Sequence, residues 1–199
     1  MIARPYPPAA RRASVRAAGA VCAAVGVLSL CACEPAGRAV GDTQDAAPET
    51  AHSATERNEL VVALIGSKTA VADDLVLDAL ERADLDAVYV SVRDEADAGA
   101  AARQGVRDMA ERLVSVIVVS DADVSDDADG WDDALREARA AGVPVALLNP
   151  VHAPDDDTLY AVSLVLNDRA ADAVALDDAL VAVADDEPHD REIVVTTLS

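Results

Sequence analysis

Apolar runs that alternate with amphipathic helical segments restrict the fold of this chain more than any other feature of its sequence. The runs, each short enough for a buried strand, occupy residues 60–65, 87–92, 114–119, 145–148, 160–166 and 193–198. Apolar residues at helical spacing fill the intervals at 71–83, 97–113, 129–141 and 169–184. Strands that alternate with helices form a parallel sheet, and continuous apolar runs indicate burial on both faces. We therefore predict an α/β fold, a Rossmann-like parallel sheet with helices on both faces.

Residues 1–32 have the three parts of an export signal. Four arginines without an acidic residue are followed by an apolar run over residues 17–30 and by Ala32 before Cys33. This run is shorter than the about 20 apolar residues of a membrane-spanning helix, which favours cleavage. Its end, Leu30-Cys31-Ala32-Cys33, resembles the lipobox of bacterial lipoproteins. The resemblance implies a lipoprotein signal peptide over 1–32, lipidation of Cys33, and a lipid-anchored position on the extracytoplasmic face of the cell membrane.

Alternatives to this interpretation stay open. Ordinary secretory cleavage and an uncleaved anchor are compatible with the same pattern. Arg11-Arg12 also allows a twin-arginine signal, although Ala13-Ser14-Val15 is a poor continuation of one. Each alternative still exports the chain.

The remaining sequence divides into a tether and one domain. Residues 33–58 are rich in Pro, Ala, Thr, Asp and Glu without an apolar period, which predicts a flexible tether. Residues 59–199 are long enough for a single core. All three cysteines precede this domain, so it contains neither a disulfide nor a thiolate metal site. The formal net charge of −21 excludes nucleic acid as a plausible partner, because phosphate binding depends on clusters of Lys and Arg.

Polar residues that follow the expected strands are the candidate ligand-binding residues. In open parallel sheets, ligands bind beyond the carboxyl ends of the strands. The residues that the sequence places there are Gly66, Ser67, Lys68, Arg93, Asp94, Asp121, Asp123 and Asn149. The predicted ligand contacts among them are Ser67, Lys68, Arg93, Asp121 and Asn149. Turn formation and solvation are the alternative roles for each of these positions.

Several segments resemble the amino-terminal lobe of periplasmic sugar-binding proteins of the ribose-binding type. They are Gln104, Met109 and Leu113 before Val116-Ile117-Val118-Val119-Ser120, residues 131–145 with their Ala-Gly-Val-Pro-Val end, and Val165 to Asp168 followed by Ala170 and Ala171. The resemblance covers residues 59–199 and implies a single lobe of a type I periplasmic-binding-protein fold. It also implies capture of a small-molecule ligand, a sugar, for an ABC importer, with an ABC permease as partner.

The sequence departs from this family at the sugar contacts and in length. The loop Gly66-Ser67-Lys68-Thr69-Ala70 lacks the family's stacking aromatics, and Asn149-Pro150 stands where the family has Asp-Arg. Tyr89 and Trp131 are expected in the core. Family members close two lobes around the ligand, whereas this chain ends after what resembles the first strand of a second lobe. We expect a sugar-type solute-binding lipoprotein, and the alternative is a truncated or remnant one-lobe interaction module without transport activity.

Other chemistries lack the residues that they need. The histidines, His52, His152 and His189, fall in the tether or in polar loops without a Ser-His pairing, so neither an enzyme nor a cofactor is expected. The loop over residues 121–130 is rich in aspartate, but Asp126 stands where an EF-hand requires glycine, so no metal is expected. A phospho-receiver domain would need an aspartate at the end of the first strand, where the sequence has Gly66.

Overall fold

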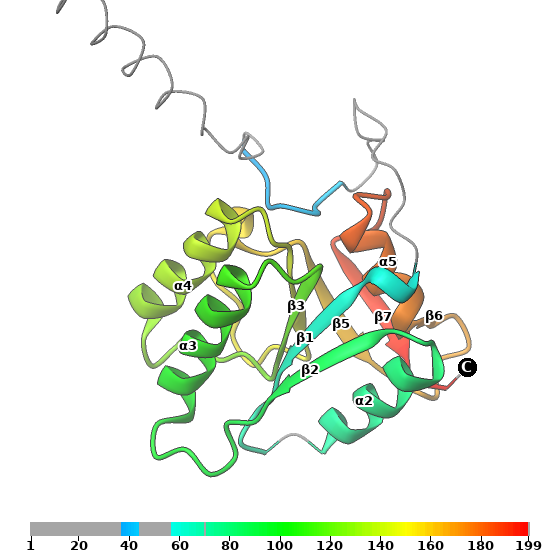
Figure 1. Cartoon of the computed structure of the whole chain (residues 1–199), viewed down its shortest axis with the longest axis horizontal. Coiled ribbons are helices and arrows are strands. Elements are labelled where there is room, and N and C mark those ends of the chain that lie inside the picture. Colours follow the sequence, from blue (N-terminus) through cyan, green and yellow to red (C-terminus); the bar gives the residue numbers. More distant parts are fainter. Residues whose placement is uncertain (1–36, 44–56, 70, 199) are drawn as a thin grey trace, which may run out of the picture. The chain divides into compact units, whose positions relative to one another are not determined.

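One parallel sheet is the centre of the lobe in the computed structural model, which describes residues 37–43, 57–69 and 71–198 (Figure 1). In this part of the chain the strands are β1 (Val61–Ile65), β2 (Asp86–Val90), β3 (Val116–Ser120), β4 (Val145–Leu148), β5 (Val162–Leu166), β6 (Val174–Ala175) and β7 (Glu192–Thr196). They lie in the order β2-β1-β3-β4-β5-β7-β6, and every neighbouring pair is parallel. The chain goes from β1 to β2 on one side and then crosses to β3 on the other side of β1, so the strand order reverses between β1 and β3.

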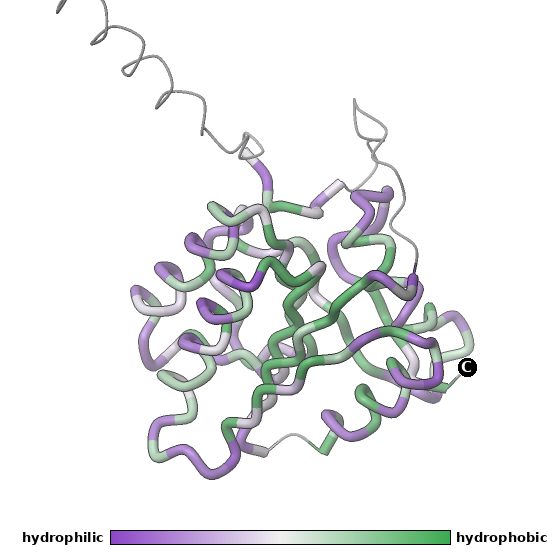
Figure 2. Tube along the Cα trace, viewed as in Figure 1, coloured by the Kyte–Doolittle hydropathy of each residue, from purple (hydrophilic) through white to green (hydrophobic). Residues whose placement is uncertain are grey.

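Helices cover both faces of this sheet. The described α-helices are α2 (Ala72–Arg82), α3 (Ala98–Glu111), α4 (Ala128–Ala140) and α5 (Leu176–Ala184), with 3-10 turns η1 (Arg57–Glu59) and η2 (Asp157–Leu159). Helices α3 and α4 pack with Ile65 and Val119 on one face, while α2 and α5 pack with Leu64 and Val118 on the other. Figure 2 shows that the central strands are mostly hydrophobic, whereas hydrophilic residues alternate with hydrophobic ones along the surrounding helices. The predicted Rossmann-like α/β fold with helices on both faces is confirmed.

The fourth expected helix is shorter than the pattern predicts. The prediction that this helix begins at residue 169 is wrong, because α5 begins at Leu176 and residues 174–175 form the edge strand β6. A turn at Asn167 is the physical reason. Its side-chain oxygen accepts a hydrogen bond of 3.1 Å from the backbone N–H of Arg169, a local bond that competes with helix formation. The other expected elements lie within a few residues of their predicted positions.

Asp168 ties the same turn to the end of β7. Its carboxylate accepts hydrogen bonds from the hydroxyl of Thr196 (2.8 Å), the backbone N–H of Thr197 (2.7 Å) and the hydroxyl of Thr197 (2.9 Å). The bond from the backbone N–H of Thr197 is the largest cause of a pKa of Asp168 that lies below its usual value. The ionised carboxylate therefore joins the loop before α5 to the last strand.

Residues 37–43, which we call the strap, contact the lobe although composition predicts a flexible tether there. Four of them, Ala39, Gly41, Asp42 and Thr43, are buried. Their polar partners belong to the loop before β7, far along the chain, so no local pattern indicates the contact. The signal peptide, Cys33, and residues 34–36 and 44–56 of the expected tether lie outside the described residues. Within the described ranges, no helix has the length and apolar character needed to cross a membrane.

We expect Asp168→Ala to lower the free energy of unfolding at pH 7 by about 1–3 kcal/mol, because three donors lose a charged acceptor. Since the pKa of Asp168 is lowered by folding, its contribution is fully present above about pH 4, the usual aspartate value. The contribution is lost as the pH falls through the lower folded-state pKa. Urea denaturation between pH 7 and pH 3 measures both effects, and the difference between variant and parent should shrink toward pH 3.

The matched control for this experiment is Asp172→Ala, which removes an exposed carboxylate from the same loop. We expect this variant to unfold at nearly the same urea concentration as the parent. Equal destabilisation by the two substitutions would contradict the role assigned to Asp168.

Candidate functional site

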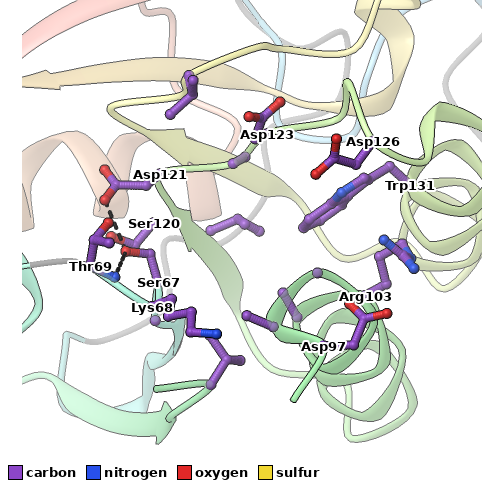
Figure 3. A pocket seen from close by; sticks show the side chains of 18 of the residues that line it. Ser67, Lys68, Thr69, Asp97, Arg103, Ser120, Asp121, Asp123, Asp126 and Trp131 are labelled. Carbon is purple, nitrogen blue, oxygen red and sulfur yellow. Dashed lines mark hydrogen bonds between the residues drawn. The ribbon is translucent and has the colours of Figure 1, made fainter. Parts of the chain in front are cut away.

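A cavity of about 640 Å³ opens beyond the carboxyl ends of β1 and β3 (Figure 3). This volume is in the range of about 300–1,000 Å³ that small-molecule sites occupy. From these neighbouring strands the chain leaves in opposite directions, toward β2 after β1 and toward β4 after β3. The loops diverge at such a switch point and leave a crevice, which is where open α/β sheets bind ligands. The cavity is therefore the candidate ligand site of the lobe.

Ser67 joins the loops that follow β1 and β3. Its hydroxyl donates a hydrogen bond of 2.9 Å to Oδ2 of Asp121 and accepts one of 3.2 Å from the backbone N–H of Thr69 (Figure 3). Asp121 has a φ of +49°, in the left-handed region that aspartate tolerates better than most residues. The bond between Ser67 and Asp121 thus holds two diverging loops together at the cavity.

Asp73 supports the loop after β1 from the side of α2. This buried carboxylate accepts hydrogen bonds from the backbone N–H of Ser67 (3.3 Å) and from the hydroxyl of Tyr89 (3.0 Å). Burial, and then the contact with Asp73, raise the pKa of Tyr89, so its hydroxyl stays protonated at neutral pH. A Cβ at position 66 would lie 2.6 Å from Oδ2 of Asp73 and from the Tyr89 hydroxyl, so any residue larger than glycine would displace these two side chains. The expectation that Tyr89 lies in the core is wrong, since it is 37% exposed on the edge strand β2.

The N-termini of α3 and α4 form another wall of the cavity. Asp97 caps α3 by accepting a hydrogen bond of 2.9 Å from the backbone N–H of Ala100, and Asp127 caps α4 through that of Gly130 (3.1 Å). Asp127 also forms an ion pair of 2.8 Å with Arg103 of α3. The caps that begin the two helices therefore also place two carboxylates at the cavity.

Arg103 lies over the indole ring of Trp131. Its guanidinium carbon is 6.0 Å from the ring centroid, the geometry of a cation–π contact. Only 3% of Trp131 is exposed, as expected for a core residue, yet the side chain also lines the cavity. The cavity therefore has an aromatic wall, over which the guanidinium of Arg103 lies.

Asp123 and His152 connect the loops after β3 and β4. Oδ1 of Asp123 accepts hydrogen bonds from the hydroxyl (2.6 Å) and the backbone N–H (3.0 Å) of Ser125, and Nδ1 of His152 lies 3.0 Å away. The hydroxyl of Ser125 is the largest cause of a lowered pKa of Asp123. The carboxylate is therefore ionised at neutral pH and adds negative charge to the rim of the cavity.

Ser120 presents an unpartnered hydroxyl to the cavity. It is the last residue of β3 and is 4% exposed, and its Oγ has no hydrogen-bond partner within the described residues. A buried hydroxyl without a partner costs free energy that a ligand can recover by bonding to it. Ser120 is thus the lining residue with the clearest unused hydrogen-bonding capacity.

The lining as a whole is acidic. Its charged members are Asp97, Asp121, Asp123, Asp126, Asp127, Lys68 and Arg103. The carboxylates are spread around the wall, and in the described part of the chain no three His, Cys, Asp or Glu residues converge as a metal site. The wall therefore combines negative charge with hydroxyl groups and one aromatic ring.

The structure brings together three of the five predicted ligand residues. Ser67, Lys68 and Asp121 line the cavity, as do Gly66 and Asp123 from the wider candidate set. Arg93 and Asp94 are exposed in the loop after β2 and lie outside the lining. Asn149 also lies outside it, because its side-chain oxygen accepts a hydrogen bond of 2.9 Å from the backbone N–H of Leu166 and so links the end of β4 to β5.

The residues that sequence reasoning missed are Asp97, Arg103, Ser120, Asp127 and Trp131. Ser120 could have been found, since it ends an apolar strand at the correct edge of the sheet. The two aspartates could have been recognised as caps just before helices. Arg103 and Trp131 lie within helices, and only the packing of α3 against α4 brings them to the cavity.

The chain has distant structural similarity to a known solute-transport protein. No protein-family model matches the chain, and no curated protein matches it. The chain is similar in structure to a carbohydrate transporter from Acidothermus cellulolyticus 11B in complex with myo-inositol, with a TM-score of 0.38 and 15% sequence identity. The similarity covers 69% of this chain and 55% of that chain, so this chain spans about half the length of that protein.

We expect Arg103→Ala to expose the ring of Trp131, the single tryptophan of the chain, to water. Its fluorescence emission should shift to longer wavelength, and quenching by acrylamide should increase about twofold or more. The matched control is Arg107→Ala, which removes a neighbouring arginine of α3 that pairs with Glu137. An unchanged spectrum in Arg103→Ala would show that other groups cover the ring.

Proposed function

We propose that this lobe binds a small polyhydroxylated molecule, a sugar or polyol, in the cavity beyond β1 and β3. The observation that carries the proposal is the position of the cavity at the switch point of the strand order, with the free hydroxyl of Ser120 in its wall. Ligand sites in open α/β sheets occur at this position because the diverging loops leave room there.

The chemistry of the wall suits a ligand with many hydroxyl groups. Such groups both donate and accept hydrogen bonds, so they can donate to Asp121 and accept from Lys68 and Ser120. Trp131 supplies an apolar surface of the kind on which the C–H face of a sugar ring packs, provided that Arg103 moves aside. The family's stacking residues are absent from the loop after β1, and Trp131 on α4 would take their place.

The charge of the wall restricts the ligand further. Five aspartates face one lysine and one arginine, and Arg103 is already paired with Asp127. A carboxylate or phosphate on a ligand in the cavity would be repelled by the negative charges of these aspartates. We therefore propose a neutral or cationic ligand and expect sugar acids to be excluded.

Binding without chemical conversion is the activity that the cavity supports best. The hydroxyl of Ser67 is bonded to a carboxylate, whereas an activated serine nucleophile needs a basic partner such as histidine. His152 lies at the rim and is bonded to Asp123. We propose a binding protein rather than an enzyme on this basis.

The proposed location is the extracytoplasmic face of the cell membrane, where a lipid on Cys33 would anchor the chain. The lipobox-like Leu30-Cys31-Ala32-Cys33 supports this location. In the same proposal, the captured solute is passed to an ABC permease, which is the role of the sugar-binding family that the sequence resembles. If no solute binds, the alternative of a one-lobe interaction module takes precedence.

Solute binding can be measured by isothermal titration calorimetry and by the fluorescence of Trp131. We expect myo-inositol or a neutral sugar from a broad panel to bind, and the corresponding sugar acids to bind at least tenfold more weakly. Lys68→Ala and Ser120→Ala should each weaken binding by up to about tenfold, the effect of one lost hydrogen bond. Arg93→Ala is the matched control, because Arg93 is exposed and outside the lining. A panel without heat or spectral change would overturn the proposal.

Anchoring is tested by Cys33→Ala in a bacterium that lipidates exported proteins. We expect the parent protein in the membrane fraction and the variant in the soluble fraction, because the variant lacks the sulfur that carries the lipid. Ser53→Ala, a substitution in the expected tether, should leave the distribution unchanged. A membrane-bound Cys33→Ala protein would indicate an uncleaved anchor instead.

A further inference from the structure

The strap (residues 37–43) is bound to the loop that leads into β7. The carboxylate of Asp42, which is 4% exposed, lies 2.5 Å from Nη1 of Arg191. The hydroxyl of Thr43 donates a hydrogen bond to the backbone carbonyl of Glu187. A buried carboxylate that pairs with arginine is costly to separate from its partner. The end of the strap is therefore held by specific polar contacts.

Two further contacts extend along the strap toward its start. The backbone carbonyl of Gly41 lies 2.7 Å from Nε2 of His189, and the carbonyl of Arg38 accepts a hydrogen bond of 3.2 Å from the guanidinium of Arg139. Arg139 belongs to the last turn of α4. The strap thus spans from α4 to the loop before β7.

The backbone of the strap also fits closely against the lobe. Gly41 has a φ of +78°, and a Cβ at this position would lie 2.8 Å from Cβ of Pro144 and 2.9 Å from the carbonyl oxygen of Val183. Gly37 has a similar φ of +74°, but a Cβ there would meet no atom within 4 Å. A larger residue at position 41 would therefore clash with the lobe and also strain the backbone at its positive φ. At position 37 a larger residue would only strain the backbone.

All these contacts lie at the amino edge of the parallel sheet. Pro144 directly precedes β4, Arg191 directly precedes β7, and Val183 lies in the last turn of α5. The cavity lies at the opposite, carboxyl edge, beyond β1 and β3. Strands of this length rise about 3.3 Å per residue, so the two edges are about 16 Å apart.

We propose that the strap sets the orientation of the lobe on the membrane, with the amino edge of the sheet toward the lipid and the cavity facing away from it. The inference rests on the proposed anchoring at Cys33. Four residues lead from Cys33 to Gly37, and four residues span at most about 14 Å. A free tether over residues 33–58 would let the lobe turn in any direction, whereas a bound strap leaves only this short link.

The proposed orientation has a consequence for solute transfer. A cavity that faces away from the membrane is open to solutes from the outside and turned away from a permease embedded in the lipid. Transfer to a permease then requires release of the strap, which lengthens the link to the lobe by the seven residues of the strap and those that follow it. The strap would therefore separate capture from delivery.

The orientation can be measured on the full lipidated protein in lipid vesicles. Two single-cysteine variants carry a fluorophore, Thr69→Cys at the rim of the cavity and Glu187→Cys at the amino edge; both side chains are exposed. Of the three native cysteines, only Cys33 remains after cleavage, and its lipid blocks labelling. With nitroxide-labelled lipids in the vesicles, we expect the label at position 187 to be quenched several-fold more than the label at position 69.

Release of the strap should remove this difference. Gly41→Ala places a methyl group against Pro144. Gly37→Ala is the matched control, because it also puts a side chain at a positive φ but brings its methyl group near no other atom. Asp42→Asn is a second release variant that adds no volume, so a folding defect in Gly41→Ala leaves the test intact. We expect the two release variants to be quenched nearly equally at both positions and the control to behave like the parent.

The outcomes separate this inference from the proposed anchoring. If the parent protein does not float with vesicles, anchoring at Cys33 is contradicted and the orientation with it. If it floats but both labels are quenched equally, or position 69 more strongly, the orientation alone is wrong. If the release variants retain the parent's difference, the strap does not set the orientation.

Discussion

Burial of β3 on both faces is the constraint on which the rest of the structure depends. All five residues of this strand are buried, with Val119 facing α3 and α4 and Val118 facing α2 and α5. A strand of this kind needs a helical layer on each side, and the chain can supply two layers only by crossing the sheet in both directions. The crossing from β2 to β3 past β1 creates the switch point, so the cavity is a consequence of how the core is closed.

The polar residues around the cavity serve the fold and the site together. Asp97 and Asp127 begin helices, and Ser67 with Asp121 holds two loops that would otherwise separate. Because their bonds to the backbone and to each other leave acceptor capacity unused, the same carboxylates can receive hydroxyl groups of a ligand. Ser120 differs from them, since the fold gives its hydroxyl no partner at all among the described residues.

The two edges of the sheet are used differently. Loops at the carboxyl edge leave an open, acidic wall, whereas the amino edge is closed by the strap through Asp42, Thr43 and Gly41. This separation follows from a parallel sheet, in which all strands start at one edge and end at the other. Attachment at one edge and capture at the other is the arrangement that we propose for the protein on its membrane.

The sequence by itself determined the alternation of strands and helices along the chain, apart from β6, and with it the parallel sheet, because the period of apolar residues along each segment is a local property. It also indicated that Ser67, Lys68 and Asp121 lie at the carboxyl edge, where the structure has them in the lining of the cavity, since residues just after buried strands must lie at that edge. Tertiary structure alone decided the rest. Packing of α3 on α4 brings Trp131 to the cavity. The side-chain oxygen of Asn149 accepts a hydrogen bond from Leu166, and Asp42 of the strap pairs with Arg191, which is distant in sequence. Contacts between distant segments depend on the assembled core, and for that reason no local pattern contained them.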